Sequence, residues 1–390
     1  MEKIKLIKST FLDENKTKEK LIGFLRNSEI LSMNKECKKF EENFSNKQGR
    51  KYSVFVSNGS CANLLLIQAM LNLGRFKKGD KIAVSSLTWA TNVMPLIELG
   101  LNPIPVDCEK ETLNINVEKI KEIAEKESIK GVFLTNVLGF CSEIDKIQEY
   151  CQQKDIIFLE DNCESLGSEY KERLLGNFGF ASTFSFFVGH HISTIEGGMI
   201  CTDDYELYEH LKMIRAHGWT RNNSEDFQKK LGEKNNIDEF YSKYAFYDLA
   251  YNFRPTEING FIGNEQIKHW EFIVNKREEN FYKFYKATEK NDKIIKLNLK
   301  NLTKVSNFAF PLVFKDRESF LKYQEKFIKN NIEIRPIIAG NITKQPFFRK
   351  YLGEFYCENS DFVHQNGFYI PNNPELDESE IKLITSLLKE

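Results

Sequence analysis

The 390-residue sequence has no long apolar run and almost no net charge. No stretch approaches the roughly 18 consecutive apolar residues that a membrane-spanning helix needs. The N-terminal stretch MEKIKLIKSTFLDENKTKEK lacks the uninterrupted apolar core of a signal peptide. A formal net charge of −1 argues against a nucleic-acid-binding protein, which normally carries a basic face. We therefore expect a cytoplasmic protein that binds neither membranes nor nucleic acids.

Closely spaced cysteines are also missing. The eight cysteines are scattered, and no two of them stand in a C-x-x-C arrangement. In a chain without a signal peptide they are expected to be free thiols in a reducing compartment. Neither a zinc site nor an iron–sulfur cluster is supported by this spacing, so we predict no metal.

The third absence is local: no lysine occurs from residue 172 to residue 211. Inside this gap, residues 182–204 (STFSFFVGHHISTIEGGMICTDD) have the pattern of a strand, a tight turn and a glycine-marked return. His190 and His191 stand at the turn. From the spacing alone a structural role is favoured, with a metal ligand or a proton-transfer base as alternatives. Adjacent residues of an extended chain point to opposite sides, which makes the pair poor at chelating one metal.

Short apolar runs alternate with helical patterns from about residue 51 to residue 204. This alternation predicts an α/β fold with a mostly parallel sheet covered on both faces. Ligands of such sheets bind beyond the carboxyl ends of the strands. Three polar segments fall at predicted strand ends: residues 57–60, 88–89 and 160–164.

After about residue 270 the pattern changes to a long amphipathic helix and an antiparallel α/β lobe. We predict a large domain at residues 1–270, with an N-terminal arm, and a small C-terminal domain at residues 271–390.

Several motifs could carry chemistry, and each has an alternative explanation. VSNGSCANLLL opens a helix whose free N–H groups suit a phosphate, although Asn58 or Ser60 could simply cap that helix. DIIFLEDNCES brings Glu160 and Asp161 to a strand end, where a carboxylate could pair with a protonated ring nitrogen or belong to a solvated acidic loop.

Ser185 could add a hydroxyl to the phosphate site. RAHGWTRN and YNFRPTEINGFIG place arginines beside aromatic groups, which suits phosphate or carboxylate binding but also an ordinary surface or interface.

The order of six motifs resembles the DegT/DnrJ/EryC1/StrS family of sugar aminotransferases. The motifs are SNGSCANLL, LTWATN, LEDNCESLGS, FSFFVGHHISTIEGG, IRAHGWTR and YNFRPTEINGFIG. The resemblance implies the aspartate-aminotransferase type of fold (fold type I), pyridoxal 5′-phosphate as cofactor, and a homodimer with active sites at the subunit interface.

Transferred motif by motif, the family's site residues give a set of expectations for this chain. Asp161 should pair with the pyridine nitrogen, Trp89 should stack on the ring, and Glu164 should lie near the ring hydroxyl. The phosphate should be held by Gly59, Ser60, Ser185 and Asn252, the last of these from the partner subunit. Candidates for binding the sugar nucleotide or the glutamate carboxylate are His217, Arg221 and Arg254.

The chain departs from the aminotransferases at one position. Where they carry the lysine that bonds covalently to the cofactor, this sequence has His190. An imidazole forms no stable bond of that kind but transfers protons near neutral pH. The HH…EGG pattern resembles the 3-dehydratases of deoxysugar synthesis, in which His190 would be the catalytic residue.

The resemblance therefore implies a lyase that removes the C3 hydroxyl of a nucleotide-linked 4-keto-6-deoxy sugar, GDP-linked by preference, for surface polysaccharide synthesis. L-Glutamate would convert pyridoxal phosphate to pyridoxamine 5′-phosphate, and ammonia would leave after elimination. The alternatives are a nucleotide-sugar 4-aminotransferase and an inactive ligand-binding or scaffold homologue. The sugar could be a heptose instead of a hexose. A related branch uses an iron–sulfur cluster, which the dispersed cysteines disfavour.

Overall fold

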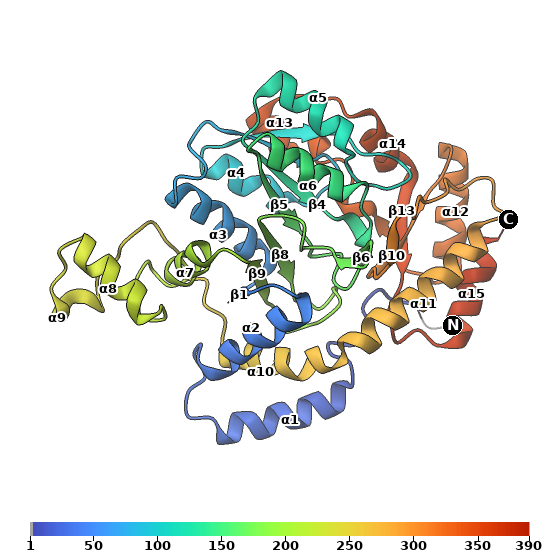
Figure 1. Ribbon diagram of the computed structural model, residues 1–390. Coiled ribbons are helices and arrows are strands. Elements are labelled where there is room, and N and C mark those ends of the chain that lie inside the picture. Colours follow the sequence, from blue (N-terminus) through green and yellow to red (C-terminus); the bar gives the residue numbers. More distant parts are fainter. Residues whose placement is uncertain (1–2, 390) are drawn as a thin grey trace.

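The computed structural model describes residues 3–389. A seven-stranded sheet in the order β1-β9-β8-β5-β4-β2-β3 forms its centre (Figure 1). The strands are β1 Tyr52–Val56, β2 Lys81–Ser85, β3 Asn102–Val106, β4 Gly131–Thr135, β5 Ile157–Asp161, β8 Ala181–Ser185 and β9 Gly198–Thr202. Neighbours from β3 to β8 run parallel, whereas β9 is antiparallel to both β8 and β1. The predicted α/β fold with a mixed, mostly parallel sheet is confirmed.

Helices cover both faces of the sheet. Side chains alternate along each buried strand, so each strand contributes apolar residues to both helical layers. Ile82 and Val84 of β2 pack with one group of helices, and Ala83 faces the other. The first group is α3 Gly59–Asn72, α4 Met94–Glu98 and α7 Tyr205–Ile214. The second group is α2 Lys35–Gln48, α5 Val117–Glu127 and α6 Ile144–Gln153.

An aromatic cluster buttresses β8 from the face opposite α3. Phe184 and Phe186 pack there edge-on against Phe44 of α2, with ring centroids 5.0 and 5.2 Å apart. Such edge-to-face pairs are worth roughly 0.5–1.5 kcal/mol each beyond their burial. Because the strand alternates, the two phenylalanines turn Thr183 and Ser185 toward α3.

The C-terminal lobe begins with the long helix α11 Trp270–Thr288, at the predicted domain boundary. Its sheet has the order β11-β13-β12 and is antiparallel. The remaining elements of the lobe are β10 Leu302–Lys304, β11 Ala309–Val313, α12 Arg317–Lys329, β12 Arg335–Pro336, α13 Pro346–Leu352, α14 Glu358–Asn366, β13 Gly367–Pro371 and α15 Glu378–Leu388. β10 pairs with the short hairpin of β6 Glu169–Tyr170 and β7 Arg173–Leu174.

The lobe docks on the carboxyl edge of the central sheet. Asp107, directly after β3, accepts hydrogen bonds from the backbone N–H groups of Asn359 and Ser360 at 2.8 and 2.9 Å. One buried cluster contains residues of both units, among them Val132 of β4 and Phe310 of β11. The lobe is thus held next to the strand ends where ligands are expected, and the division into two domains stays a prediction.

The N-terminal segment lies on the C-terminal lobe. The Ile4 N–H donates to the Asn331 carbonyl and the Ile4 carbonyl accepts from the Glu333 N–H, both at 2.9 Å. The Leu6 N–H donates to Glu333 Oε2 at 3.0 Å, and Lys8 pairs with Glu380. Residues 4–8 therefore form an edge of the lobe, although the predicted arm was grouped with the large domain.

One segment projects from the rest of the molecule (Figure 1). It contains α8 Glu225–Lys234 and α9 Glu239–Ser242, and none of the residues in these two helices is buried. The two other helices outside the sheet layers are α1 Glu14–Asn27 and α10 Glu257–Gln266. Within residues 3–389, no helix combines the length and apolarity needed to cross a bilayer.

Candidate functional site

Asp161 ends β5 and is buried at 4% exposure. Its Oδ2 accepts from the side-chain amides of Asn63 and Asn92 at 2.9 and 2.7 Å. Its Oδ1 accepts from the Cys163 N–H at 2.9 Å. These three donors hold the carboxyl group in one orientation. A buried, fixed carboxylate at a strand end is suited to pairing with a cationic ring nitrogen.

Glu160, one residue earlier, faces the other side of the strand. It is fully buried and accepts from the N–H groups of Gly176, Phe178 and Gly179 at 2.6–2.8 Å. This carboxylate organises the 176–179 loop, so of the two acidic residues only Asp161 belongs to the site.

The turn after β1 supplies an anion site. Asn58 caps α3 by accepting the Cys61 N–H at 2.8 Å. Within the described residues, neither the Gly59 N–H nor the Ser60 N–H donates a hydrogen bond inside the chain. Two free N–H groups at the start of a 14-residue helix, together with its dipole, suit a phosphate. The sequence left helix capping and phosphate binding as alternatives. In the structure Asn58 caps the helix while the N–H groups of Gly59 and Ser60 remain available for a phosphate, so both roles are compatible.

Ser185 lies against this turn. A Cβ on Gly59 would stand 2.7 Å from Ser185 Cβ and 3.0 Å from its Oγ. Gly198 of β9 is packed equally closely, since its Cβ would stand 2.3 Å from the Asn58 carbonyl oxygen. Only glycine at positions 59 and 198 allows the turn to rest on the ends of β8 and β9. The Ser185 hydroxyl is thereby brought beside the free N–H groups.

His190 lies in the loop that follows β8 and is half-buried, and its Nδ1 is buried without a hydrogen-bond partner in the described chain. The ring packs against Phe187 and Phe308, with centroids 5.9 and 5.6 Å away. Burial lowers the pKa of His190 to about 4, against opposing effects of the Ser185 backbone and the Asp161 charge. A neutral imidazole at pH 7 can accept a proton. His191 is buried, and its Nε2 lies 3.3 Å from the Ser306 carbonyl oxygen, which fits the structural role.

Glu164 and Trp89 flank the same strand ends. Glu164 accepts the Leu138 N–H at 3.0 Å, and burial raises the pKa of this carboxyl to about 8, with a smaller contribution from Asp161. Leu138 adopts the left-handed conformation (φ 49°), which is costly for a leucine and aims its N–H at Glu164. The Trp89 side chain, beyond β2, is 55% exposed and free to stack on a planar ligand.

The remaining predicted residues form a separate, exposed group. His217 packs edge-on against Trp219, with centroids 5.0 Å apart. The Arg221 and Arg254 guanidinium carbons stand 3.9 and 5.6 Å from the centroid of the same indole. Asn252 accepts from Arg254 Nε at 2.9 Å and makes no hydrogen bond to Gly59, Ser60 or Ser185 in the described chain. The structure thus brings together His217, Arg221 and Arg254, but does not join them to Asp161 within one chain.

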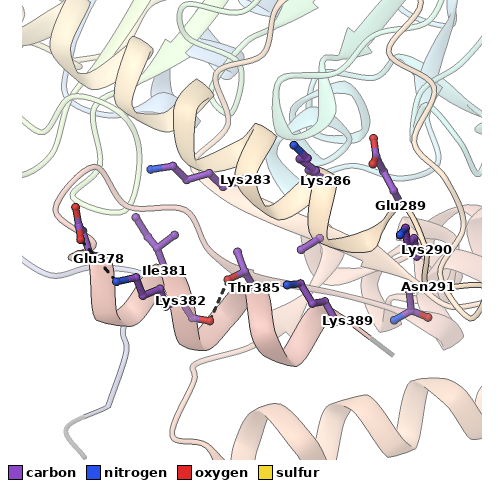
Figure 2. Close-up of a pocket in the computed structure, with 11 residues that line it drawn as sticks. Lys283, Lys286, Glu289, Lys290, Asn291, Glu378, Ile381, Lys382, Thr385 and Lys389 are labelled. Carbon is purple, nitrogen blue, oxygen red and sulfur yellow. Dashed lines mark hydrogen bonds and ion pairs between the residues drawn. The ribbon is translucent and has the colours of Figure 1, made fainter.

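A large surface hollow lies elsewhere, between α11 and α15 (Figure 2). It measures about 980 Å³, and none of the predicted site residues lines it. Its walls carry the five lysines 283, 286, 290, 382 and 389. Lysines on an open surface are ordinary solvated groups, so volume alone does not locate the site.

Sequence reasoning missed the residues that hold the predicted ones in place. Asn63 and Asn92 lie inside the motifs SNGSCANLL and LTWATN, but nothing local marks them as partners of Asp161. Arg277 reaches the His190 loop from α11, 87 residues away in sequence. No group of three or more His, Cys, Asp and Glu residues is arranged for a metal ion within residues 3–389.

Comparison with known proteins identifies the family of the chain. The model of the DegT/DnrJ/EryC1/StrS aminotransferase family matches residues 12–389. The chain belongs to this family. A relative from Yersinia pseudotuberculosis, GDP-4-keto-6-deoxy-D-mannose 3-dehydratase, is 38% identical over 373 residues, which cover 93% of each chain.

Two solved structures extend the likeness to family members with a cofactor. The E. coli GDP-4-keto-6-deoxy-D-mannose 3-dehydratase with bound hydrated pyridoxal phosphate has a TM-score of 0.88 and 33% identity, with 100% of both chains covered. A GDP-4-keto-6-deoxymannose-3-dehydratase with a trapped pyridoxal phosphate–glutamate geminal diamine also has a TM-score of 0.88, with 34% identity over 99% of this chain and 100% of the other. The fold type I architecture expected from the motifs is confirmed.

Proposed function

We propose that this family member is a glutamate-dependent dehydratase that removes the C3 hydroxyl of a GDP-linked 4-keto-6-deoxy sugar. It would use pyridoxal and pyridoxamine 5′-phosphate, act in the cytoplasm and supply a 3,6-dideoxy sugar for surface polysaccharide. The single observation that carries this proposal is His190 in a segment without lysine, beside the Asp161 and Ser185 site.

The cofactor fits the residues present. The free N–H groups of Gly59 and Ser60, with the Ser185 hydroxyl, form a cradle that the glycine leaves open for a phosphate. The buried Asp161 carboxylate would hold a protonated ring nitrogen, and the exposed Trp89 indole would cover one ring face. When bound, the cofactor supplies the amine that engages a ketone and the ring that withdraws electrons.

The protein's own contribution centres on proton transfer. The neutral His190 imidazole would accept a proton beside the cofactor and return it to the departing C3 hydroxyl. A lysine at this position would compete for the cofactor, whereas histidine leaves the cofactor amine free. Proton transfer is retained and amino-group release to the sugar is disfavoured, which favours elimination over transamination.

We further propose that two copies assemble. The projecting segment of one copy and the residues that flank it, Asn252, His217, Arg221 and Arg254, would complete the site of the other copy. The segment exposes large apolar side chains that are unusual on a monomer surface. They are Phe240, Tyr241, Tyr244, Phe246 and Leu249, all at least 64% exposed. Sedimentation velocity over a range of protein concentrations tests this assembly.

The decisive experiment follows glutamate, ammonia and sugar mass in one reaction, with a panel of 4-keto nucleotide sugars that includes hexoses and heptoses. We expect one ammonia for each 3-deoxy sugar, without any added reductase. A product with a C4 amine and its C3 hydroxyl would establish an aminotransferase instead. A requirement for a reductase would favour the iron–sulfur branch, and failure to bind the cofactor would favour an inactive homologue.

A second test addresses the lysine gap directly. Borohydride treatment of the cofactor-loaded protein should leave no cofactor bound to residues 182–204 in peptide mass spectrometry. His190→Lys should introduce covalent attachment at position 190 and increase the aminated product. A reduced adduct on the unsubstituted segment would contradict the proposed role of His190.

A further inference from the structure

Arg277 of α11 is a buried cation beside the His190 loop. Its side chain is 4% exposed. Nη1 donates to the carbonyl oxygens of Phe308, at 3.2 Å, and Asn372, while Nη2 donates to the His190 carbonyl oxygen at 3.4 Å. One guanidinium therefore ties together three backbone segments that are far apart in sequence.

These segments are the ones that surround His190. The Phe308 residue whose carbonyl accepts from Arg277 also packs its ring on the His190 imidazole, 5.6 Å away. Asn372 returns a hydrogen bond from its side chain to the Arg277 carbonyl at 3.0 Å. The geometry fixes both the backbone of His190 and the ring against which the imidazole rests.

The charge of Arg277 is unusual for such a role. No carboxylate forms an ion pair with it within residues 3–389, and Glu375 is the only acid with a resolved influence on it. Removing a cation from water without a paired anion carries a large desolvation penalty. A neutral side-chain amide could donate to two of these carbonyls without that penalty, so the retained charge itself needs an explanation.

We propose that Arg277 is a positioning residue for His190: its guanidinium holds the His190 backbone and the Phe308 segment against which the imidazole packs, and its unpaired positive charge opposes a second positive charge on that imidazole. The inference rests on the proposed role of His190 as the base. Two charges act on His190: Asp161 on β5 favours the protonated form, whereas Arg277 on α11 opposes it. The neighbouring His191 is itself kept neutral, because burial, Arg277 and His190 all lower its pKa. The Arg277 guanidinium adds to burial in lowering the pKa of both histidines.

Two substitutions separate orientation from charge. Arg277→Gln removes the charge and keeps donors, whereas Arg277→Lys keeps the charge and loses the planar fork. Arg50→Gln is the matched control, because Arg50 is also a buried arginine that donates to two backbone carbonyls, those of Gly176 and Gly179, away from His190. With only six histidines in the chain, ring carbon NMR of ¹³C-labelled histidine can follow each one, and His190→Asn assigns the signal.

In the cofactor-free protein we expect the wild-type His190 signal to stay that of a neutral ring between pH 5 and 8. Arg277→Gln should raise the midpoint of the His190 titration above that of wild type, while burial, the larger cause of the low pKa, remains. In the loaded enzyme the acid limb of the kcat/KM profile should move upward to the same extent. Arg277→Lys should leave the titration in place and lower kcat roughly tenfold to a hundredfold, with KM little changed.

Arg50→Gln should lower the melting temperature and leave the His190 titration unchanged. An unchanged His190 titration in folded Arg277→Gln would overturn the charge role. Wild-type kcat in Arg277→Lys would overturn the orientation role, and this variant keeps the test open if the glutamine variant does not fold. Because the NMR titration uses neither cofactor nor sugar, its result is independent of which reaction the enzyme catalyses.

Discussion

The predicted site has two halves, and they are built differently. One is the strand-end pocket formed by Gly59, Asp161, Ser185 and His190, and the other is the projecting segment with its flanking residues. In the pocket, Asp161 has three donors and sits at 4% exposure. In the segment, Arg221 is exposed, lies against the faces of Trp219 and Tyr244, and donates from Nε to the Lys243 carbonyl at 2.8 Å. The pocket side chains are held by the chain's own core, whereas the segment side chains are held mainly by one another.

This difference indicates which properties each half controls. A pocket residue fixed by several partners can serve chemistry at once, since no further ordering is needed. The exposed aromatic and arginine cluster becomes ordered only against another surface. Substitutions in the pocket should therefore change turnover or cofactor binding, and substitutions in the segment should change assembly and substrate affinity.

The largest expected effect is for Asp161→Asn. A neutral amide no longer stabilises a protonated ring, and its NH₂ must face one of the three donors now bound by the carboxylate. We expect kcat to fall roughly a hundredfold or more. Glu160→Gln, one residue away on the opposite face, should lower stability more than turnover. Turnover near wild type in Asp161→Asn, measured in the glutamate and sugar assay, would show that the cofactor lies elsewhere.

Gly59→Ala should weaken cofactor binding. The new Cβ would stand 2.7 Å from Ser185 Cβ, so the turn must move away from the phosphate position. A displacement that costs about 1–3 kcal/mol corresponds to a Kd increase of roughly 5-fold to 150-fold, measurable by absorbance titration with pyridoxal phosphate. Gly23→Ala is the control, because nothing lies within 4 Å of its added Cβ. Equal affinities for the two variants would contradict the proposed phosphate cradle.

Arg221→Ala should act on the other half of the comparison. Loss of the guanidinium that stacks on Trp219 should raise the dimer dissociation constant and the KM for the nucleotide sugar several-fold, since arginine and tryptophan dominate interfaces. Cofactor affinity should not change. Lys229→Ala, on the exposed face of α8, is the control. A selective loss of cofactor binding in Arg221→Ala would remove the distinction between the two halves.

The smallest effect concerns Glu164, whose pKa is raised to about 8 by burial. The folded protein holds this proton after the unfolded chain has released it near pH 4.5, so folding stability falls as pH rises between these values. Glu164→Gln abolishes that titration. We expect the variant to melt like wild type at pH 5 and at a higher temperature at pH 8 in cofactor-free protein. Parallel melting curves of the two proteins across this range would show that Glu164 is ionised.

Much of the fold followed from local patterns, and the site followed only in part. Strand–helix alternation predicted the sheet and placed residues 57–60, 88–89 and 160–164 at strand ends, as observed. Periodicity could not tell which of Glu160 and Asp161 faces the pocket, because that depends on the elements packed on each side of β5. The side-chain partners of Asp161 are non-local: Asn63 and Asn92 are 98 and 69 residues away. Such contacts follow from tertiary packing, which a single sequence does not encode in its spacing.

The attachment of residues 4–8 to the C-terminal lobe has a consequence for synthesis of the protein. The Leu6 N–H bonds to a side chain 327 residues later in the chain. At about 5–20 residues per second, a ribosome needs roughly 15–65 s to reach that partner after Leu6 is made. During this interval residues 4–8 have no edge to pair with, so their attachment to the C-terminal lobe must be a late step of folding. Deletion of residues 4–8 would therefore interfere with the end of folding, not with its beginning.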